Sequence, residues 1–177
     1  GMVRLFGIGV MAACAGSILV SVLAAKDAIL IWRAHKLGIY DPRVDFYLFL
    51  DKLLTGRIVS LVGTTRQEGT MQTWRLFSAP ENNYYFDMGW VRLFYWYGVI
   101  PAIIMIVVLF VFLLYFYKKR MLAELAMIGV ISVYTIVEAH VVSVYLARNY
   151  ILFLIGMYWW QILAGKWLKE PKEEGQL

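Results

Sequence analysis

Ionisable side chains in apolar surroundings are the residues of this sequence that could do chemistry. Asp87 lies in the aromatic stretch YYFDMGWVRLFYWYGVIP, residues 84–101, and Glu138 lies in a largely apolar run from 121 to 146. A positioned carboxylate can take a proton from a substrate hydroxyl, as a general base does. Charged side chains at membrane depth are costly and usually serve a function. We therefore regard Glu138 as a candidate catalytic residue.

Arginines near these acids could bind an anionic group. Arg57 follows Gly56 in LDKLLTGRI, Arg92 shares the aromatic stretch with Asp87, and Arg33 belongs to a small basic group. A planar guanidinium matches the geometry of a phosphate or diphosphate, so Arg57 and Arg33 are candidate substrate-binding residues. The structural alternatives are a surface charge at a helix C-terminus for Arg57 and interfacial snorkelling for Arg33.

Two further polar residues follow Glu138 closely. His140 is two positions later, so on a helix the two side chains point to nearly opposite faces and do not pair. His140 is a candidate catalytic residue, with a packing histidine as the alternative. Asn149 stands where the chain is expected to turn, and it is a candidate substrate-binding residue or a helix cap.

Common cofactor and metal motifs are absent from the sequence. There is no glycine-rich phosphate loop, paired-cysteine site, His-Glu-x-x-His motif or serine nucleophile elbow. We therefore expect no cofactor and no metal. The single cysteine, Cys14, can form no internal disulfide and is interpreted as a packing residue.

Composition assigns the chain to the membrane class. Of its 177 residues, 62% are hydrophobic and 16% are charged, whereas soluble domains are less apolar and carry more charge. The 17 Lys and Arg residues are spread over loops and helix ends and form no basic face, so we expect no nucleic-acid partner.

The hydropathy pattern predicts an all-α integral membrane protein, a single membrane domain of residues 1–177 with about four transmembrane helices. The expected spans are 3–25, 97–117, 121–146 and 149–167, and the third would place Glu138 well inside its helix. Residues 26–91 are expected to form one long loop that contains an amphipathic helix over 43–56. Pro42 and Gly56 would mark the start and the end of that helix.

A short basic turn predicts the orientation. Lys118, Lys119 and Arg120 separate two expected spans, and basic residues in short loops favour the cytoplasmic side. The long loop would then face outward, and the charged tail 168–177 would be cytoplasmic. The aromatic residues from 84 to 97 are expected to form a membrane-interface belt, with a sugar-stacking platform as the alternative.

Three motifs in order resemble the C-terminal part of bacterial oligosaccharide repeat-unit polymerases of O-antigen, capsule and exopolysaccharide biosynthesis. These motifs are LDKLLTGRIVSL, YYFDMGWVRLFYWYGVIP and EAHVVSVYLARNYILFLIG, and the likeness covers roughly residues 45–160. The chain departs from the family pattern at Thr55, where a serine is usual, and at Met88, where an asparagine is usual. Family members have many more spans than four, so the chain would correspond to a terminal part or a shortened relative.

The resemblance implies an activity at the outer face of the bacterial cytoplasmic membrane. Such polymerases join polyprenyl-diphosphate-linked repeat units and use no nucleotide or obligate metal, and a flippase and a chain-length regulator would be partners. By position, Arg57 matches the arginine of the first motif and Asp87 the acid of the second. The resemblance thus implies a catalytic role for Asp87 and a substrate-binding role for Arg57 and the neighbouring Arg92. Glu138, His140 and Asn149 match the late polar positions. The alternatives are an O-antigen ligase-like transferase and a non-catalytic membrane subunit or inactive remnant.

Overall fold

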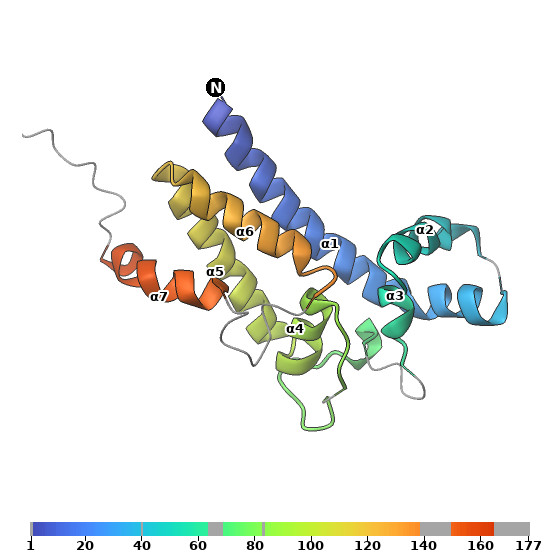
Figure 1. Ribbon diagram of the computed structural model, residues 1–177. Coiled ribbons are helices and arrows are strands. Elements are labelled where there is room, and N and C mark those ends of the chain that lie inside the picture. The colour runs from blue at the N-terminus through green and yellow to red at the C-terminus, as the bar shows by residue number, and fades with distance from the viewer. Residues whose placement is uncertain (1, 40, 64–68, 83, 139–149, 165–177) are drawn as a thin grey trace, which may run out of the picture.

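The computed structural model describes residues 2–39, 41–63, 69–82, 84–138 and 150–164, and all regular structure in these ranges is helical (Figure 1). This confirms the all-α prediction for the described part of the chain. The elements are α1 (Met2–Leu37), η1 (Pro42–Val44), α2 (Asp45–Leu53), α3 (Arg57–Ser60), η2 (Met71–Thr73), α4 (Gly89–Tyr97), α5 (Val99–Lys118), α6 (Leu122–Tyr134) and α7 (Tyr150–Leu163).

The longest helix, α1, organises the other elements (Figure 1). Its first half packs against α6, which in turn packs against α5, and its second half contacts α2, α3 and α4. The predicted end of this helix near residue 25 is wrong, because the helix continues to Leu37. No Gly or Pro interrupts residues 26–37, and the helix ends only before Gly38, which has a φ of 66°.

Two described helices are long and apolar enough to cross a membrane, namely α1 from Arg4 onward and α5. At 1.5 Å per residue, the 36 residues of α1 span about 54 Å, well beyond a hydrocarbon core of about 30 Å. The second expected span, 97–117, corresponds to α5. The basic turn predicted after it is confirmed at Lys119 and Arg120.

The third expected span differs from the structure in its length. Helix α6 covers only 13 residues and ends at Tyr134, so Glu138 lies beyond the helix and not within it. Residues 139–146 of that expected span lie outside the described residues. The fourth expected span corresponds to α7, of 14 residues, which is also shorter than the roughly 20 residues that cross a bilayer.

The amphipathic helix predicted over 43–56 is present but divided. Pro42 begins η1, α2 follows, and the helix stops at Leu53 rather than at Gly56. Thr55 and Gly56 both adopt left-handed backbone angles, and α3 begins immediately after them. The prediction was therefore right about the helix and about Gly56 as a turn residue, but it placed the C-terminal end of the helix three residues too late.

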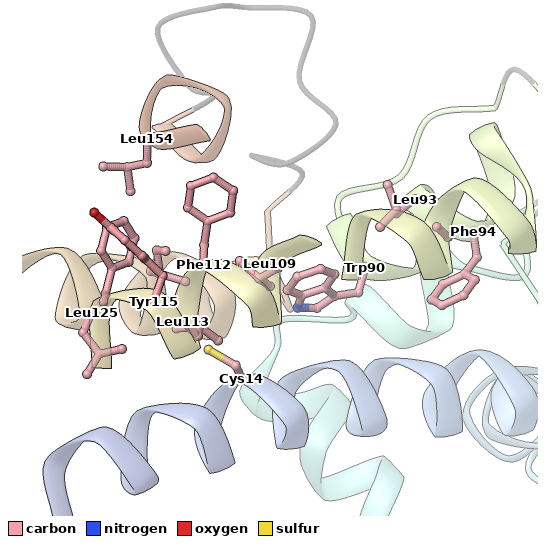
Figure 2. Close-up of a cluster of buried hydrophobic side chains, with 13 residues drawn as sticks. Cys14, Trp90, Leu93, Phe94, Leu109, Phe112, Leu113, Tyr115, Leu125 and Leu154 are labelled. Atoms are coloured by element: carbon pink, nitrogen blue, oxygen red, sulfur yellow. The ribbon is translucent and has the colours of Figure 1, made fainter. Parts of the chain in front are cut away.

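Two apolar clusters hold these elements together. In the first, shown in Figure 2, the Cys14 side chain points from α1 toward Leu113 of α5, as a packing residue would. The second surrounds the C-terminal half of α1 and includes Met88. Many aromatic residues predicted to form an interface belt lie inside these clusters, and Trp90 is only 1% exposed. Tyr84, Tyr85 and Tyr97 remain exposed.

The start of α5 depends on a glycine. Gly98 has φ 90° and ψ 168°, a region open essentially only to glycine. The turn at Gly98 lets the backbone N–H groups of Val99 and Ile100 donate to the carbonyls of Arg75 and Leu76, at 2.8 and 3.1 Å. These bonds satisfy N–H groups that a helix start otherwise leaves without partners.

Replacing Gly98 with Ala should destabilise the protein. The added Cβ would lie 2.5 to 2.7 Å from backbone atoms of Phe77, in a backbone conformation that alanine disfavours. We expect the free energy of unfolding to fall by about 2 kcal/mol or more, measured by thermal denaturation in detergent. In the matched control Gly16→Ala, the new Cβ meets nothing within 4 Å, so stability should hold or rise slightly. Equal stability of the two variants would contradict this account.

Candidate functional site

The turn that carries Arg57 is unusually constrained. The N–H of Gly56 donates to the carbonyl of Asp51 at 2.9 Å, and that of Thr55 donates to the carbonyl of Lys52 at 3.3 Å. This pair of bonds is a Schellman ending for α2. The residue at its left-handed position is Thr55, with a φ of 54°, where glycine is usual. A left-handed β-branched residue is strained by about 1–2 kcal/mol, and such strain concentrates at functional sites.

A buried carboxylate fixes the other side of this turn. Asp51 is 2% exposed, and its Oδ1 accepts the backbone N–H groups of Ile58 and Val59 at 2.8 and 3.1 Å. Its Oδ2 lies 3.8 Å from Nδ1 of His35 on α1. Asp51 therefore ties the start of α3 to α2 and places the Arg57 side chain.

Arg57 joins two carboxylates from distant parts of the chain. Its Nη1 lies 3.2 Å from Oδ2 of Asp87, and its Nη2 lies 3.8 Å from Oε1 of Glu138. Each of the three side chains is about 30% exposed, so solvent reaches the cluster. We call these three residues the ionic cluster. Each of the three motifs identified in the sequence contributes one member.

The end of α6 brings Glu138 to this position. Trp90 Nε1 donates to the carbonyl of Ser132 at 3.0 Å, and Gly89 N–H donates to that of Thr135 at 2.9 Å. Arg57 Nε donates to the carbonyl of Val137 at 3.3 Å. Donors from α3 and α4 therefore occupy carbonyls at and after the helix end, and the chain turns there toward Arg57. A cation at a helix C-terminus also interacts favourably with the helix dipole.

Among the described residues, the ionic cluster has one carboxylate more than its single guanidinium balances. Asp87 makes the shorter contact to Arg57 and is the better counterion, whereas Glu138 is held more loosely at 3.8 Å. Partly exposed ion pairs contribute little to stability. An incompletely paired carboxylate in a position open to solvent is a hydrogen-bond acceptor suited to a substrate hydroxyl.

Met88 accounts for one departure from the polymerase pattern. Its side chain is fully buried in the second apolar cluster, between Asp87 and Gly89. An asparagine amide in that apolar place would need hydrogen-bond partners. Here the methionine instead anchors the segment that presents Asp87.

The structure places Arg92 in the interior of the protein. It is 2% exposed, and its Nη2 donates to the carbonyl of Phe86. The guanidinium carbon lies 3.7 Å from the ring centroid of Tyr85 and 4.8 Å from that of Trp96. These cation–π contacts support a structural role for Arg92, which fastens residues 85–86 to α4.

The remaining candidates are Arg33, His140 and Asn149. Arg33 is exposed on the last turns of α1. His140 and Asn149 lie outside the described residues, so their predicted roles stay predictions. Within the described ranges, no group of three or more His, Cys, Asp or Glu side chains could hold a metal ion.

The residue that sequence reasoning missed is Asp51. Asp51 lies in the motif LDKLLTGRI, and the sequence alone assigns it no role. The available signal was an acid in the last turn of an amphipathic helix, directly before a Thr-Gly turn, where an acceptor can reach the freed N–H groups. Asp41 caps η1 in a similar way on the surface, where hydrogen bonds from Arg43 lower the pKa of its carboxyl to about 2.

No protein-family model, no curated protein and no solved structure matches this chain. The likeness to polysaccharide polymerases therefore rests on the three motifs, and the site has to be interpreted from its own geometry.

Replacing Asp51 tests its role in placing Arg57. Asp51→Ala should lower the free energy of unfolding by about 2 kcal/mol, because the Ile58 and Val59 N–H groups lose their acceptor. Asp51→Asn keeps an acceptor oxygen and should lose clearly less. Thermal denaturation in detergent measures both. If the two variants were equally destabilised, the backbone bonds would not be the source of the effect.

Proposed function

We propose that this chain acts in a membrane glycan polymerase that joins polyprenyl-diphosphate-linked oligosaccharide repeat units into a surface polysaccharide. The observation that carries the proposal is the convergence of Arg57, Asp87 and Glu138, one from each motif, in a single solvent-reached cluster. Residues 57, 87 and 138 are far apart in the sequence, and local structure alone would not bring them together.

The proposed topology has four spans, with the segment that carries α2 and α3 on the outer face of the bacterial cytoplasmic membrane. Two helices of sufficient length support two of these spans, and the basic turn after α5 supports the orientation. In this arrangement α1 extends past the hydrocarbon core by its last turns, and those turns support α3 and the ionic cluster. The cluster would then lie near the water–lipid boundary, where the diphosphate of a polyprenyl carrier also lies.

In the proposed reaction, Glu138 is the general base. The acceptor sugar hydroxyl gives its proton to Glu138 while its oxygen forms a bond to the anomeric carbon of the donor. The bond from that carbon to the diphosphate oxygen breaks, and polyprenyl diphosphate leaves with the electron pair. Asp87 orients the Arg57 guanidinium. Each Nη of Arg57 has a second hydrogen that its carboxylate contact does not use, and these can face the departing diphosphate.

Substitutions that keep size but remove charge test this assignment. Glu138→Gln should reduce polymer formation by about 100-fold or more, because the base is lost while the shape remains. Asp87→Asn and Arg57→Lys should reduce it as well, since lysine lacks the planar fork. The measurement is the length distribution of surface polysaccharide on a gel, after deletion of the gene in its own host and complementation with each variant.

The matched control is Glu124→Gln. Glu124 also lies on α6, but in its first turn, where its Oε1 accepts a hydrogen bond from Tyr158 at 3.1 Å, remote from the ionic cluster. It should support wild-type chain lengths. A normal ladder from the Glu138 variant would remove the catalytic assignment. Loss of surface glycan with long polymer retained on the lipid carrier would instead indicate a ligase-like transferase.

A further inference from the structure

An apolar groove of about 710 Å³ runs between α1 and α6. Apart from Tyr134, every side chain that lines it is a hydrocarbon, or the residue is glycine. Along α6 it extends from Ala126 to Tyr134, about 12 Å of helix. Its volume is typical of small-molecule sites, which are commonly 300–1,000 Å³.

Small residues create the groove. Gly9 and Ala13 on α1 face Ala126 and Gly129 on α6. A Cβ on Gly129 would lie 2.9 Å from Cγ1 of Val10, so this glycine permits the close helix contact. A Cβ on Gly9 would meet nothing within 4 Å, so Gly9 borders the open space itself.

One end of the groove adjoins the ionic cluster. Leu54, Ile136 and Val137 line this end. Leu54 belongs to the turn that presents Arg57, and the carbonyl of Val137 accepts a hydrogen bond from Arg57 Nε. Glu138 is the next residue in the chain. A molecule with an apolar tail and a polar head could therefore place its tail in the groove and its head at the adjoining ionic cluster.

The dimensions favour a flexible hydrocarbon chain over a protein helix. A membrane-spanning helix about 10 Å wide and 30 Å long fills more than about 2,000 Å³, so it could insert only one edge. A hydrocarbon chain carries no backbone polar groups, and the lining offers almost none to pair with. A charged or polar group belongs only at the end where the ionic cluster lies.

We propose that the α1–α6 groove binds the prenyl chain of a polyprenyl-linked substrate, with the polar head of that substrate at the ionic cluster. The identity of the lipid rests on the proposed function. The groove positions the anomeric carbon of the donor by holding the chain to which it is attached, so filling the groove weakens lipid binding without touching Arg57, Asp87 or Glu138.

Two tryptophan substitutions on one helix provide the test. Gly9→Trp fills the groove, and Gly16→Trp adds the same side chain to α1 at a position that also has open space but does not line the groove. Gly9→Leu fills it partly and serves as a second variant. Circular dichroism and gel filtration report whether each variant is folded and which oligomeric state it has.

Binding is measured with undecaprenyl phosphate added to the purified chain in detergent, by quenching of intrinsic tryptophan fluorescence and by native mass spectrometry. We expect Gly9→Trp to raise the Kd at least tenfold, Gly9→Leu to raise it less, and Gly16→Trp to leave it unchanged. Undecaprenol, which lacks the phosphate, should compete with the probe, whereas inorganic diphosphate should not.

Several results would overturn the proposal. These are wild-type affinity in Gly9→Trp, equal loss in Gly16→Trp, competition by a phospholipid as strong as that by undecaprenol, or a changed oligomeric state of Gly9→Trp alone, which would indicate a helix in the groove. The assay involves no glycan transfer, so it separates the two proposals. If the chain makes no polymer but binds undecaprenyl phosphate, and Gly9→Trp blocks that binding, the proposed polymerase function is rejected and the proposed lipid groove is retained.

Discussion

The side chain of Arg57 connects three segments that lie far apart in the sequence. It reaches from α3 to Asp87 before α4 and to Val137 and Glu138 after α6. This depends on α6 stopping at Tyr134. If the helix continued, each further residue would rotate by about 100° and rise by 1.5 Å, and Glu138 would leave the position where Arg57 meets it. At this helix end the carbonyls of Ser132 and Thr135 accept hydrogen bonds from Trp90 and Gly89.

The ionic cluster carries costs that a purely structural feature would avoid. Thr55 is held in a left-handed conformation directly before it, and two carboxylates share one guanidinium. The surroundings offset these costs, since Asp51 caps the turn and the buried Met88 anchors the neighbouring segment. Strain and unbalanced charge that are maintained by rigid packing are common at sites that bind or transform a substrate.

The proposed polymerase chemistry and the proposed lipid groove place different demands on the same helix, α6. Catalysis requires a fixed arrangement of charges at the end of α6, and prenyl binding requires empty apolar space along its side. Gly129 serves the contact with α1, while Gly9 leaves space beside it. Glycines at these two positions therefore differ in role although both lie between the same pair of helices.

The sequence by itself determined the helical class, the apolar segments that became α1 and α5, and the basic turn between α5 and α6. These follow from composition and from local helix start and stop signals. It also singled out Arg57, Asp87 and Glu138 by their charge in apolar surroundings, but it could not place them together.

Only the tertiary structure decided where α6 ends, how far α1 continues, and which aromatic residues are buried. Local helix propensity does not predict these features. Around the end of α6, for example, the backbone carbonyls accept hydrogen bonds from Trp90, Gly89 and Arg57, which are distant in the sequence. The same holds for Asp51, whose capping role requires the chain to turn back toward it. A hydrogen-bond donor supplied by another segment can end a helix that its own sequence would extend.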